Sequence, residues 1–267
     1  MPTRICNGTT LFYEDQGDGE PLVLVHGSWA DHTNWDLVAG PLARTHRVVR
    51  YDRRGHGQST APPEDGSVQD DLADLGALIE DLGLAPANLV GNSFGACISL
   101  RLAGERPDLV RRLAGHEPPM FGVLVGDPSM QPLLDGRLSA TAAVIRHLED
   151  GQDAEAAEVF VEQVAPGSWA ALPEPIRATF VRNARTFLGE TRDPDGLTID
   201  LETLRRYPGP VLLSQGDQSP PMFAAVITTL CSALPKSQHR VLAGAGHVPQ
   251  MTHPEQYVDL LSSFLSS

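Results

Sequence analysis

The sequence is poor in the features that mark several classes of protein. Its only cysteines are Cys6, Cys97 and Cys231, which form no CxxC pair and no even set. This favours free thiols in a reducing compartment over a disulfide framework. The N-terminal stretch MPTRICNGTTLFYEDQ lacks the apolar run of a signal peptide, and no segment has the length and apolarity of a transmembrane helix. We therefore expect a cytoplasmic protein with no membrane partner.

Positive charge is also scarce. The chain has 20 Lys and Arg residues against 34 Asp and Glu residues, and its formal net charge is −14. This balance argues against nucleic acid as a partner, because binding to phosphates requires clustered cations. At 267 residues and 41% hydrophobic content, the chain can bury one sizeable core. This length predicts either one large domain or a domain with an inserted lid.

The first part of the chain alternates between strand and helix patterns. The continuous apolar runs PLVLVHG and HRVVRYD predict strands that are buried on both faces. The segment SVQDDLADLGALIEDLGL repeats apolar residues at helical spacing, and glycine near its end favours a stop. A strand in ANLVGNS, a helix in FGACISLRLAGERP and a strand in LVRRLAGHE continue the series. The alternation predicts a mostly parallel sheet that is covered by helices on both faces.

The pattern changes between residues 118 and 206, where we find no strand. Segments 139–151, 153–164 and 173–190 predict three amphipathic helices. Strand patterns resume in GPVLLSQGD and QHRVLAGAGH, and a last helix is predicted from residue 254. We therefore predict a core domain formed by residues 1–117 and 207–267, with residues 118–206 inserted as a helical lid.

The segment LVGNSFGA carries the strongest chemical signal. Residues 91–95 fit the pattern G-x-S-x-G between a predicted strand and a predicted helix. A serine on such a turn has strained backbone angles, so the residues two positions away must be small. The following helix points its positive N-terminal end at a developing oxyanion. Ser93 is therefore the candidate nucleophile.

A serine nucleophile needs a base, and the chain has nine histidines. His247 follows the last predicted strand in the glycine-rich segment AGAGH and is the preferred candidate. His253 precedes a proline at a helix start and is the second choice, although a cap or surface role also fits it. His56, in RRGHG, is more typical of a residue that braces its own loop.

The base in turn needs a carboxylate, and two fit the chain order serine, acid, histidine. Glu117 ends the strand LVRRLAGH and is followed by two prolines, which stop a strand. Asp217 follows the strand PVLLSQG. Both lie where a parallel sheet places its site. Simpler interpretations are a capping or ion-pairing role for Glu117 at the lid hinge and a turn-forming role for Asp217.

These segments together resemble the α/β-hydrolase superfamily. LVLVHGSW, YDRRGHGQS, LVGNSFGA and AGAGH occur in the family's order, from about residue 8 to 120 and from 208 to the C-terminus. The resemblance implies an eight-stranded, mostly parallel sheet with a helical lid after the sixth strand. It also implies that Ser28 and Phe94 supply oxyanion N–H groups, with Gly27 as an alternative, and that His26 is structural.

The segment after the predicted seventh strand departs from the family. Relatives commonly have Gly-x-x-Asp there, whereas this chain has Gly216 followed by Asp217, two residues early, and by Ser219 at the acid's position. A smaller group, the lactone hydrolases that open zearalenone-type macrolactones, is similar in placing a His-Glu pair near proline after the sixth strand. GHEPPM resembles that pattern. The resemblance therefore favours Glu117 over Asp217.

These patterns predict a serine hydrolase that cleaves an ester or lactone of a hydrophobic small molecule through an acyl-enzyme, without metal or cofactor. Carbon–carbon bond hydrolysis and a perhydrolase activity are alternatives on the same triad, and a non-catalytic ligand-binding protein is a different class. We expect the substrate pocket to include Trp29, Met120 and Trp169. The sequence makes no prediction of oligomeric state.

Overall fold

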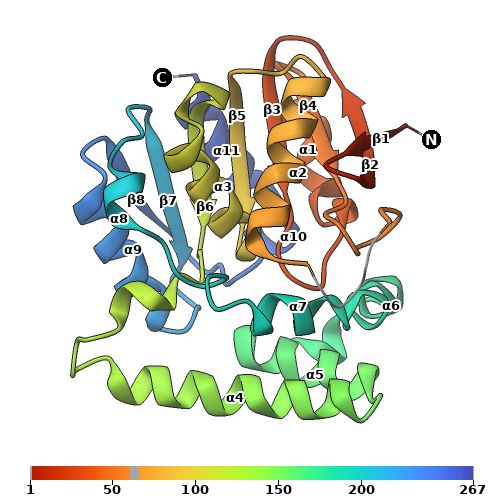
Figure 1. Cartoon of the computed structure of the whole chain (residues 1–267), viewed down its shortest axis with the longest axis vertical. Coiled ribbons are helices and arrows are strands. Elements are labelled where there is room, and N and C mark those ends of the chain that lie inside the picture. The colour runs from red at the N-terminus through yellow and green to blue at the C-terminus, as the bar shows by residue number, and fades with distance from the viewer. Residues whose placement is uncertain (1, 61–65, 267) are drawn as a thin grey trace.

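The computed structural model describes residues 2–60 and 66–266, in which eight strands form one sheet at the centre of the molecule (Figure 1). The strand order is β1-β2-β4-β3-β5-β6-β7-β8. The pairs β1–β2 and β2–β4 are antiparallel, and the remaining neighbours pair in parallel. The eight-stranded, mostly parallel sheet confirms the predicted architecture. The strands are β1 (Thr3–Cys6), β2 (Thr9–Gln16), β3 (Glu20–Val25), β4 (His46–Tyr51), β5 (Ala87–Asn92), β6 (Val110–His116), β7 (Val211–Gly216) and β8 (Ser237–Leu242).

Helices cover both faces of the sheet. α1 and α11 pack on one face, whereas α2, α3 and α9 pack on the other (Figure 1). The helices are α1 (Asp36–Leu42), α2 (Val68–Asp81), α3 (Phe94–Glu105), α4 (Gln131–Glu149), α5 (Asp153–Val164), α6 (Glu174–Asn183), α7 (Thr186–Arg192), α8 (Leu201–Leu204), α9 (Met222–Ala233), α10 (Pro249–Thr252) and α11 (Pro254–Leu265).

The central strands show why their sequences are continuously apolar. In β3, Val23 and Val25 join the core beneath α2, α3 and α9, while Leu22 and Leu24 join the core beneath α1 and α11. Side chains of a strand alternate between the two faces of a sheet, so a strand covered on both faces must be apolar at every position.

Helices α4 to α7 form a layer across the end of the sheet where β6 and β7 finish, whereas the short α8 packs beside the sheet on α3 (Figure 1). The described residues between β6 and β7 include no strand. The helix predicted over 139–151 begins earlier, at Gln131, and the single helix predicted over 173–190 is in fact two helices, α6 and α7. Trp29 of the core stacks on Phe160 of α5 and contacts Phe187 of α7, which fixes the layer to the core.

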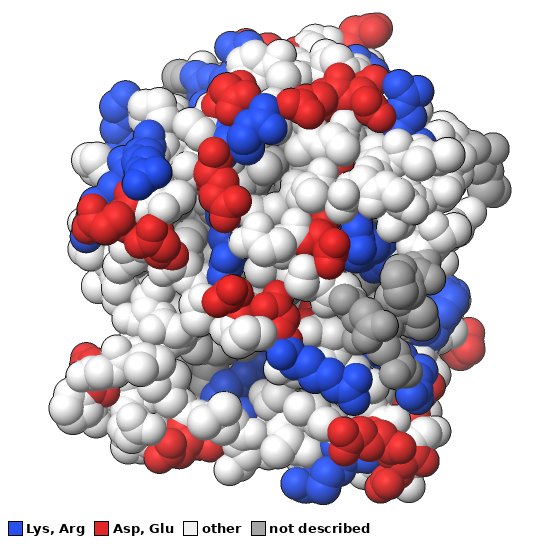
Figure 2. Space-filling model, viewed as in Figure 1, with Lys and Arg blue, Asp and Glu red and all other residues white. Residues whose placement is uncertain are grey.

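Charges of both signs are mixed on the face of the molecule that is drawn in Figure 2. Figure 2 shows acidic and basic side chains interspersed over one face, and its described part has no broad basic patch of the kind that nucleic acid requires. Within residues 2–60 and 66–266, no helix combines the length and apolarity needed to cross a membrane.

The connection from β5 to α3 is the tightest part of the core. Ser93 has φ 54° and ψ −124°, a backbone conformation that residues other than glycine rarely adopt. A Cβ on Gly95 would lie 2.1 Å from the Val25 carbonyl oxygen, and one on Gly91 would lie 2.5 Å from the Gly95 oxygen. The two glycines of the motif therefore let α3 start directly against β3 and β5.

This packing predicts a large loss of stability in Gly95→Ala. The added methyl group would overlap the backbone of β3, which cannot move without disturbing the sheet, so we expect a loss of about 3 kcal/mol or more. The measurement is the free energy of unfolding in urea. Gly40→Ala is the matched control, because Gly40 is a helical glycine with nothing within 4 Å of the added atom. It should be neutral or stabilising by about 0.5–1 kcal/mol. Equal effects of the two substitutions would contradict the tight packing.

Candidate active site

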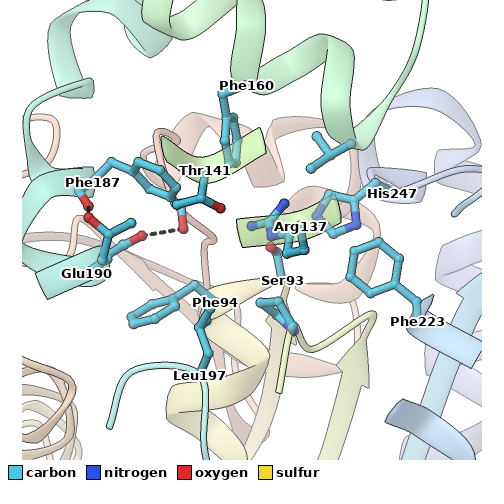
Figure 3. A pocket seen from close by; sticks show the side chains of 14 residues that line it. Ser93, Phe94, Arg137, Thr141, Phe160, Phe187, Glu190, Leu197, Phe223 and His247 are labelled. Carbon is cyan, nitrogen blue, oxygen red and sulfur yellow. Dashed lines mark hydrogen bonds between the residues drawn. The ribbon is translucent and has the colours of Figure 1, made fainter. Parts of the chain in front are cut away.

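Ser93 lies at the tip of the turn between β5 and α3, and its side chain lines a cavity beneath the lid. The imidazole of His247, from the loop after β8, lines the same cavity (Figure 3). Both residues are buried, with relative exposures of 9% for Ser93 and 6% for His247. The structure thus brings the predicted nucleophile and the predicted base to one enclosed space.

Two contacts hold the His247 ring and a third holds its backbone. Its Nδ1 lies 2.6 Å from Oε2 of Glu117, and the Phe223 ring stacks on it at 4.9 Å between centroids. The backbone carbonyl of His247 accepts a hydrogen bond from Nδ2 of Asn92, the residue before Ser93, and Gln250 donates to Oδ1 of Asn92. The Glu117 contact occupies Nδ1, so Nε2 is the nitrogen that remains for a reaction.

Glu117 is fully buried at the end of β6. Its backbone has φ 47°, and its Oε1 accepts a hydrogen bond from the Gly216 N–H at 2.8 Å. Burial alone would raise the pKa of this carboxyl, but the hydrogen bond and charge of His247 outweigh burial and lower it to about 2. The carboxylate is therefore ionised at neutral pH and stabilises a positive charge on His247.

Asp217 lies apart from this arrangement. Its side chain is exposed, and its Oδ1 accepts hydrogen bonds from the Gly244 N–H and from the Gln218 amide. The carboxylate thus joins the turn after β7 to the turn after β8, in keeping with the simpler turn-forming role considered for it. Of the two candidate acids, Glu117 is the one that contacts His247.

The other histidines have local roles. His253 stands at the N-cap position of α11, and its Nδ1 lies near the hydroxyl of its neighbour Thr252. His56 bonds to the Arg54 carbonyl and to the Thr186 hydroxyl, bracing its loop against the lid. The Nε2 of His26 accepts the Arg53 N–H, and burial lowers the pKa of this imidazole to about 4. These contacts are structural.

The predicted oxyanion donors lie beside the serine. Ser28 and Phe94 both line the cavity. The N–H of Phe94 is at the first position of α3, where a helix offers no acceptor of its own. Gly27 is so close that a Cβ on it would lie 2.9 Å from the Ser93 Cβ. The backbone of this loop therefore runs next to the position that a substrate carbonyl would occupy.

The pocket walls include residues that were not predicted. Trp29, Met120 and Trp169 are not among the residues that line the cavity that contains Ser93, so their contact with substrate stays a prediction. Trp29 and Met120 are fully buried in apolar clusters, and Trp169 packs on the lid's own helices. The apolar walls are formed instead by Phe94, Phe160, Phe187, Leu197 and Phe223.

Several site residues were not predicted. Glu190 of α7 is buried against the cavity and accepts hydrogen bonds from the Ser28 hydroxyl and from Arg53, whose other side pairs with Asp71. Arg137 of α4 also faces the cavity. The only sequence signal for Asn92 was its place next to the serine, and we find no sequence signal for Glu190 or Arg137.

The described residues include one group whose atoms could converge on a metal, Asp31, His32 and Asp52. His32 is already hydrogen-bonded to Asp52 at 2.7 Å. Asp31 accepts a hydrogen bond from the Thr33 N–H and forms an ion pair with Arg182. These contacts use the oxygen and nitrogen atoms that a metal would need. The group lies outside the Ser93 cavity.

The fold and the arrangement at the strand ends define an enzyme of the hydrolase class. The family described as alpha/beta hydrolase fold matches residues 20–254. The chain therefore belongs to that family, and it is a hydrolase. The alternative of a non-catalytic binding protein is not retained.

Individual relatives agree with this assignment. The chain is 30% identical to the 2-hydroxymuconate semialdehyde hydrolase of a Pseudomonas species, over 98% of this chain and 92% of that protein. It is 39% identical to the (E)-2-((N-methylformamido)methylene)succinate hydrolase of Acinetobacter baylyi, but that match covers only 42% of each chain. The crystal structure of an alpha/beta hydrolase from Sphaerobacter thermophilus superposes with a TM-score of 0.80 at 26% identity, covering 99% of this chain and 100% of that one.

The lowered pKa of Glu117 predicts how stability depends on pH. The folded-state pKa is about 2, against an ordinary value of 4.5. The carboxylate therefore stabilises the fold fully above its unfolded pKa, and this contribution is lost as the pH falls towards 2. From about pH 6 to about pH 3.5 the lost contribution is about 1 kcal/mol. We expect Glu117→Gln to remove this part of the pH dependence, as measured by urea unfolding at both pH values.

Asp217→Asn is the control for this measurement. It removes an exposed carboxylate that lies apart from His247, so it should keep the wild-type loss of stability between the two pH values. If Glu117→Gln showed the same pH dependence as the wild type, the buried contact with His247 would not form in solution.

Proposed function

We propose that this hydrolase cleaves a carboxylic ester or lactone with an apolar body, using Ser93, His247 and Glu117 as a catalytic triad. The observation that carries the proposal is the buried 2.6 Å contact between Glu117 and His247, next to a strained serine in the same cavity. Chemistry of this kind needs no metal or organic cofactor.

In the first half of the reaction, Oγ of Ser93 attacks the substrate carbonyl while Nε2 of His247 takes the hydroxyl proton. The carbonyl oxygen becomes an oxyanion, which the N–H groups of Ser28 and Phe94 stabilise, together with the positive end of α3. The tetrahedral intermediate then collapses. The carbon–oxygen bond to the leaving alcohol breaks, and His247 delivers the proton to that alkoxide, leaving an acyl-enzyme.

In the second half, a water molecule attacks the acyl-enzyme and gives its proton to His247. The new carbon–oxygen bond forms as the bond to Ser93 breaks, and the proton returns to the serine oxygen. Glu117 remains ionised throughout because its pKa is low. It holds Nδ1–H in place and stabilises the imidazolium that exists in both halves of the cycle.

The position of the acid supports a lactone as one form of the substrate. The segment His116-Glu117-Pro118 resembles the lactone hydrolases that open zearalenone-type macrolactones, in which the acid also follows the sixth strand. In a lactone the leaving alkoxide stays attached to the acyl group, so hydrolysis opens a ring. The mostly apolar cavity walls favour a substrate with an apolar body.

Carbon–carbon bond hydrolysis is the second candidate function. It is favoured by the relative named 2-hydroxymuconate semialdehyde hydrolase, whose match extends over 98% of this chain. A diketone-like substrate would use the same three residues. If the enzyme hydrolyses such a compound but neither esters nor lactones, the ester and lactone proposal is wrong and carbon–carbon bond hydrolysis takes its place.

Substitution of the nucleophile predicts loss of activity. Ser93→Ala should lower kcat by about 10³-fold or more, because the acyl-enzyme cannot form. Activity should be measured on short aryl esters, long-chain esters and macrolactones, and a serine-directed phosphonate should attach to Ser93 in mass spectrometry. A Ser93→Ala protein with full esterase activity would refute the mechanism.

Substitution of the two carboxylates tests the choice of acid. Glu117→Gln keeps the size of the side chain but removes its charge, and we expect kcat to fall by about 10²- to 10⁴-fold. The matched control Asp217→Asn should stay within about twofold of wild type, since surface changes away from the site have small effects. The opposite pattern would assign the acid to Asp217.

A further inference from the structure

Arg137 is a cation of the lid that faces the candidate active site. It belongs to α4 and lines the cavity that contains Ser93 and His247 (Figure 3). It also lines an adjoining, more open groove, formed on one side by α4 and on the other by Pro220, Met222 and Phe223. Arg137 therefore stands where the two spaces meet.

This arginine has no counter-charge in the described part of the chain. No hydrogen bond or ion pair joins it to a described residue, and its Nε atom is buried without a partner, although the residue as a whole is partly exposed. Its guanidinium lies over the Phe121 ring at 5.3 Å. The other charged wall residue, Glu190, is already hydrogen-bonded to Arg53 and Ser28 and leaves Arg137 unpaired.

An unpaired charge in this position is costly for the free protein. Burial lowers the pKa of Arg137 to about 10, so the side chain remains positively charged at neutral pH. Removing a cation from water without a compensating partner destabilises a fold. Such a residue is compensated when an anionic ligand occupies the site. A guanidinium forms two parallel hydrogen bonds with a carboxylate, which makes that pair both strong and directional.

We propose that the substrate carries a carboxylate in addition to the bond that is cleaved, and that Arg137 binds this carboxylate. The inference rests on the proposed function, because it places the reacting carbonyl at Ser93. Among the described residues that line the cavity, Arg137 is the only lysine or arginine. One guanidinium matches the single charge of a carboxylate better than the double charge of a phosphate ester. The apolar body of the substrate would then extend along the groove between α4 and α9.

Two esters that differ only in this charge test the inference. 4-Nitrophenyl hexanoate and mono-4-nitrophenyl adipate have acyl chains of equal length, which end in a methyl group and in a carboxylate. In Arg137→Gln, the ratio of kcat/KM for adipate to kcat/KM for hexanoate should fall by about 10- to 100-fold, the loss expected for a charge-assisted hydrogen-bonded pair. In Arg137→Lys this ratio should fall less, because an ammonium keeps the charge but not the two-point geometry.

The matched control is Arg146→Gln. Arg146 is an exposed residue of the same helix, so its removal changes the net charge equally without touching the cavity. The adipate-to-hexanoate ratio should remain at its wild-type value. If Arg146→Gln lowers the ratio as much as Arg137→Gln, the effect is long-range electrostatics and the proposed contact is wrong. If Arg137→Gln lowers kcat/KM equally for both substrates, Arg137 is a structural residue that packs on Phe121.

A binding measurement separates this inference from the proposed function. Calorimetry with free adipate and the neutral analogue hexanamide requires no turnover. Adipate should bind wild type more tightly than Arg137→Gln by about 10-fold or more, whereas hexanamide should bind the two proteins alike. If adipate binds in this way but Ser93→Ala still hydrolyses both esters, the carboxylate site stands and the serine mechanism fails. If Ser93→Ala is inactive but adipate binding is independent of Arg137, the reverse holds.

Discussion

The structure of the candidate site depends on one buried hydrogen bond, between the Glu117 carboxylate and the His247 imidazole. A carboxylate without solvent contact is tolerated only when its charge is compensated. Here His247 compensates one oxygen and the Gly216 N–H the other, so the ends of β6, β7 and β8 converge on a single side chain. The same contact sets the orientation of the imidazole and leaves Nε2 without this bond, in the cavity that Ser93 also lines. Stability and chemistry are therefore linked through Glu117.

The site also concentrates backbone strain. Only four described residues other than glycine have positive φ, and three of them, Trp29, Ser93 and Glu117, lie at the carboxyl ends of β3, β5 and β6. Such conformations cost free energy and persist only where the surroundings enforce them. The sheet core and the Trp29 stacking on lid aromatics supply that support. These strained residues place the proposed oxyanion loop, nucleophile and acid at one end of the sheet.

Much of this arrangement could be predicted from the sequence, because it depends on local patterns. The apolar strands follow from burial on both faces, and Ser93 follows from glycines whose absent Cβ atoms make room for α3. The choice of acid was harder, since Glu117 and Asp217 occupy equivalent ends of neighbouring strands. Backbone direction decides it: the Asp217 side chain turns to the Gly244 N–H instead of His247. Helix α9 was not predicted, although its buried residues Phe223, Val226 and Leu230 recur at helical spacing. The cavity walls depend on lid packing, for which the sequence has no local signal.

The lid helices divide their roles. α7 is joined to the core domain: Glu190 bonds to Ser28 and Arg53, and Phe187 packs on Trp29, so this helix helps to hold the loop that contains the proposed oxyanion residue. Arg137 of α4 makes no such bond to the described residues, and we have proposed that its charge pairs with a substrate carboxylate. Changes in α7 should therefore disturb chemistry and fold together, whereas changes at residue 137 should alter substrate choice with little effect on the core. Because function depends on the site and not on the fold alone, substrate choice can change through the less constrained of these two helices while the sheet and the proposed triad are kept.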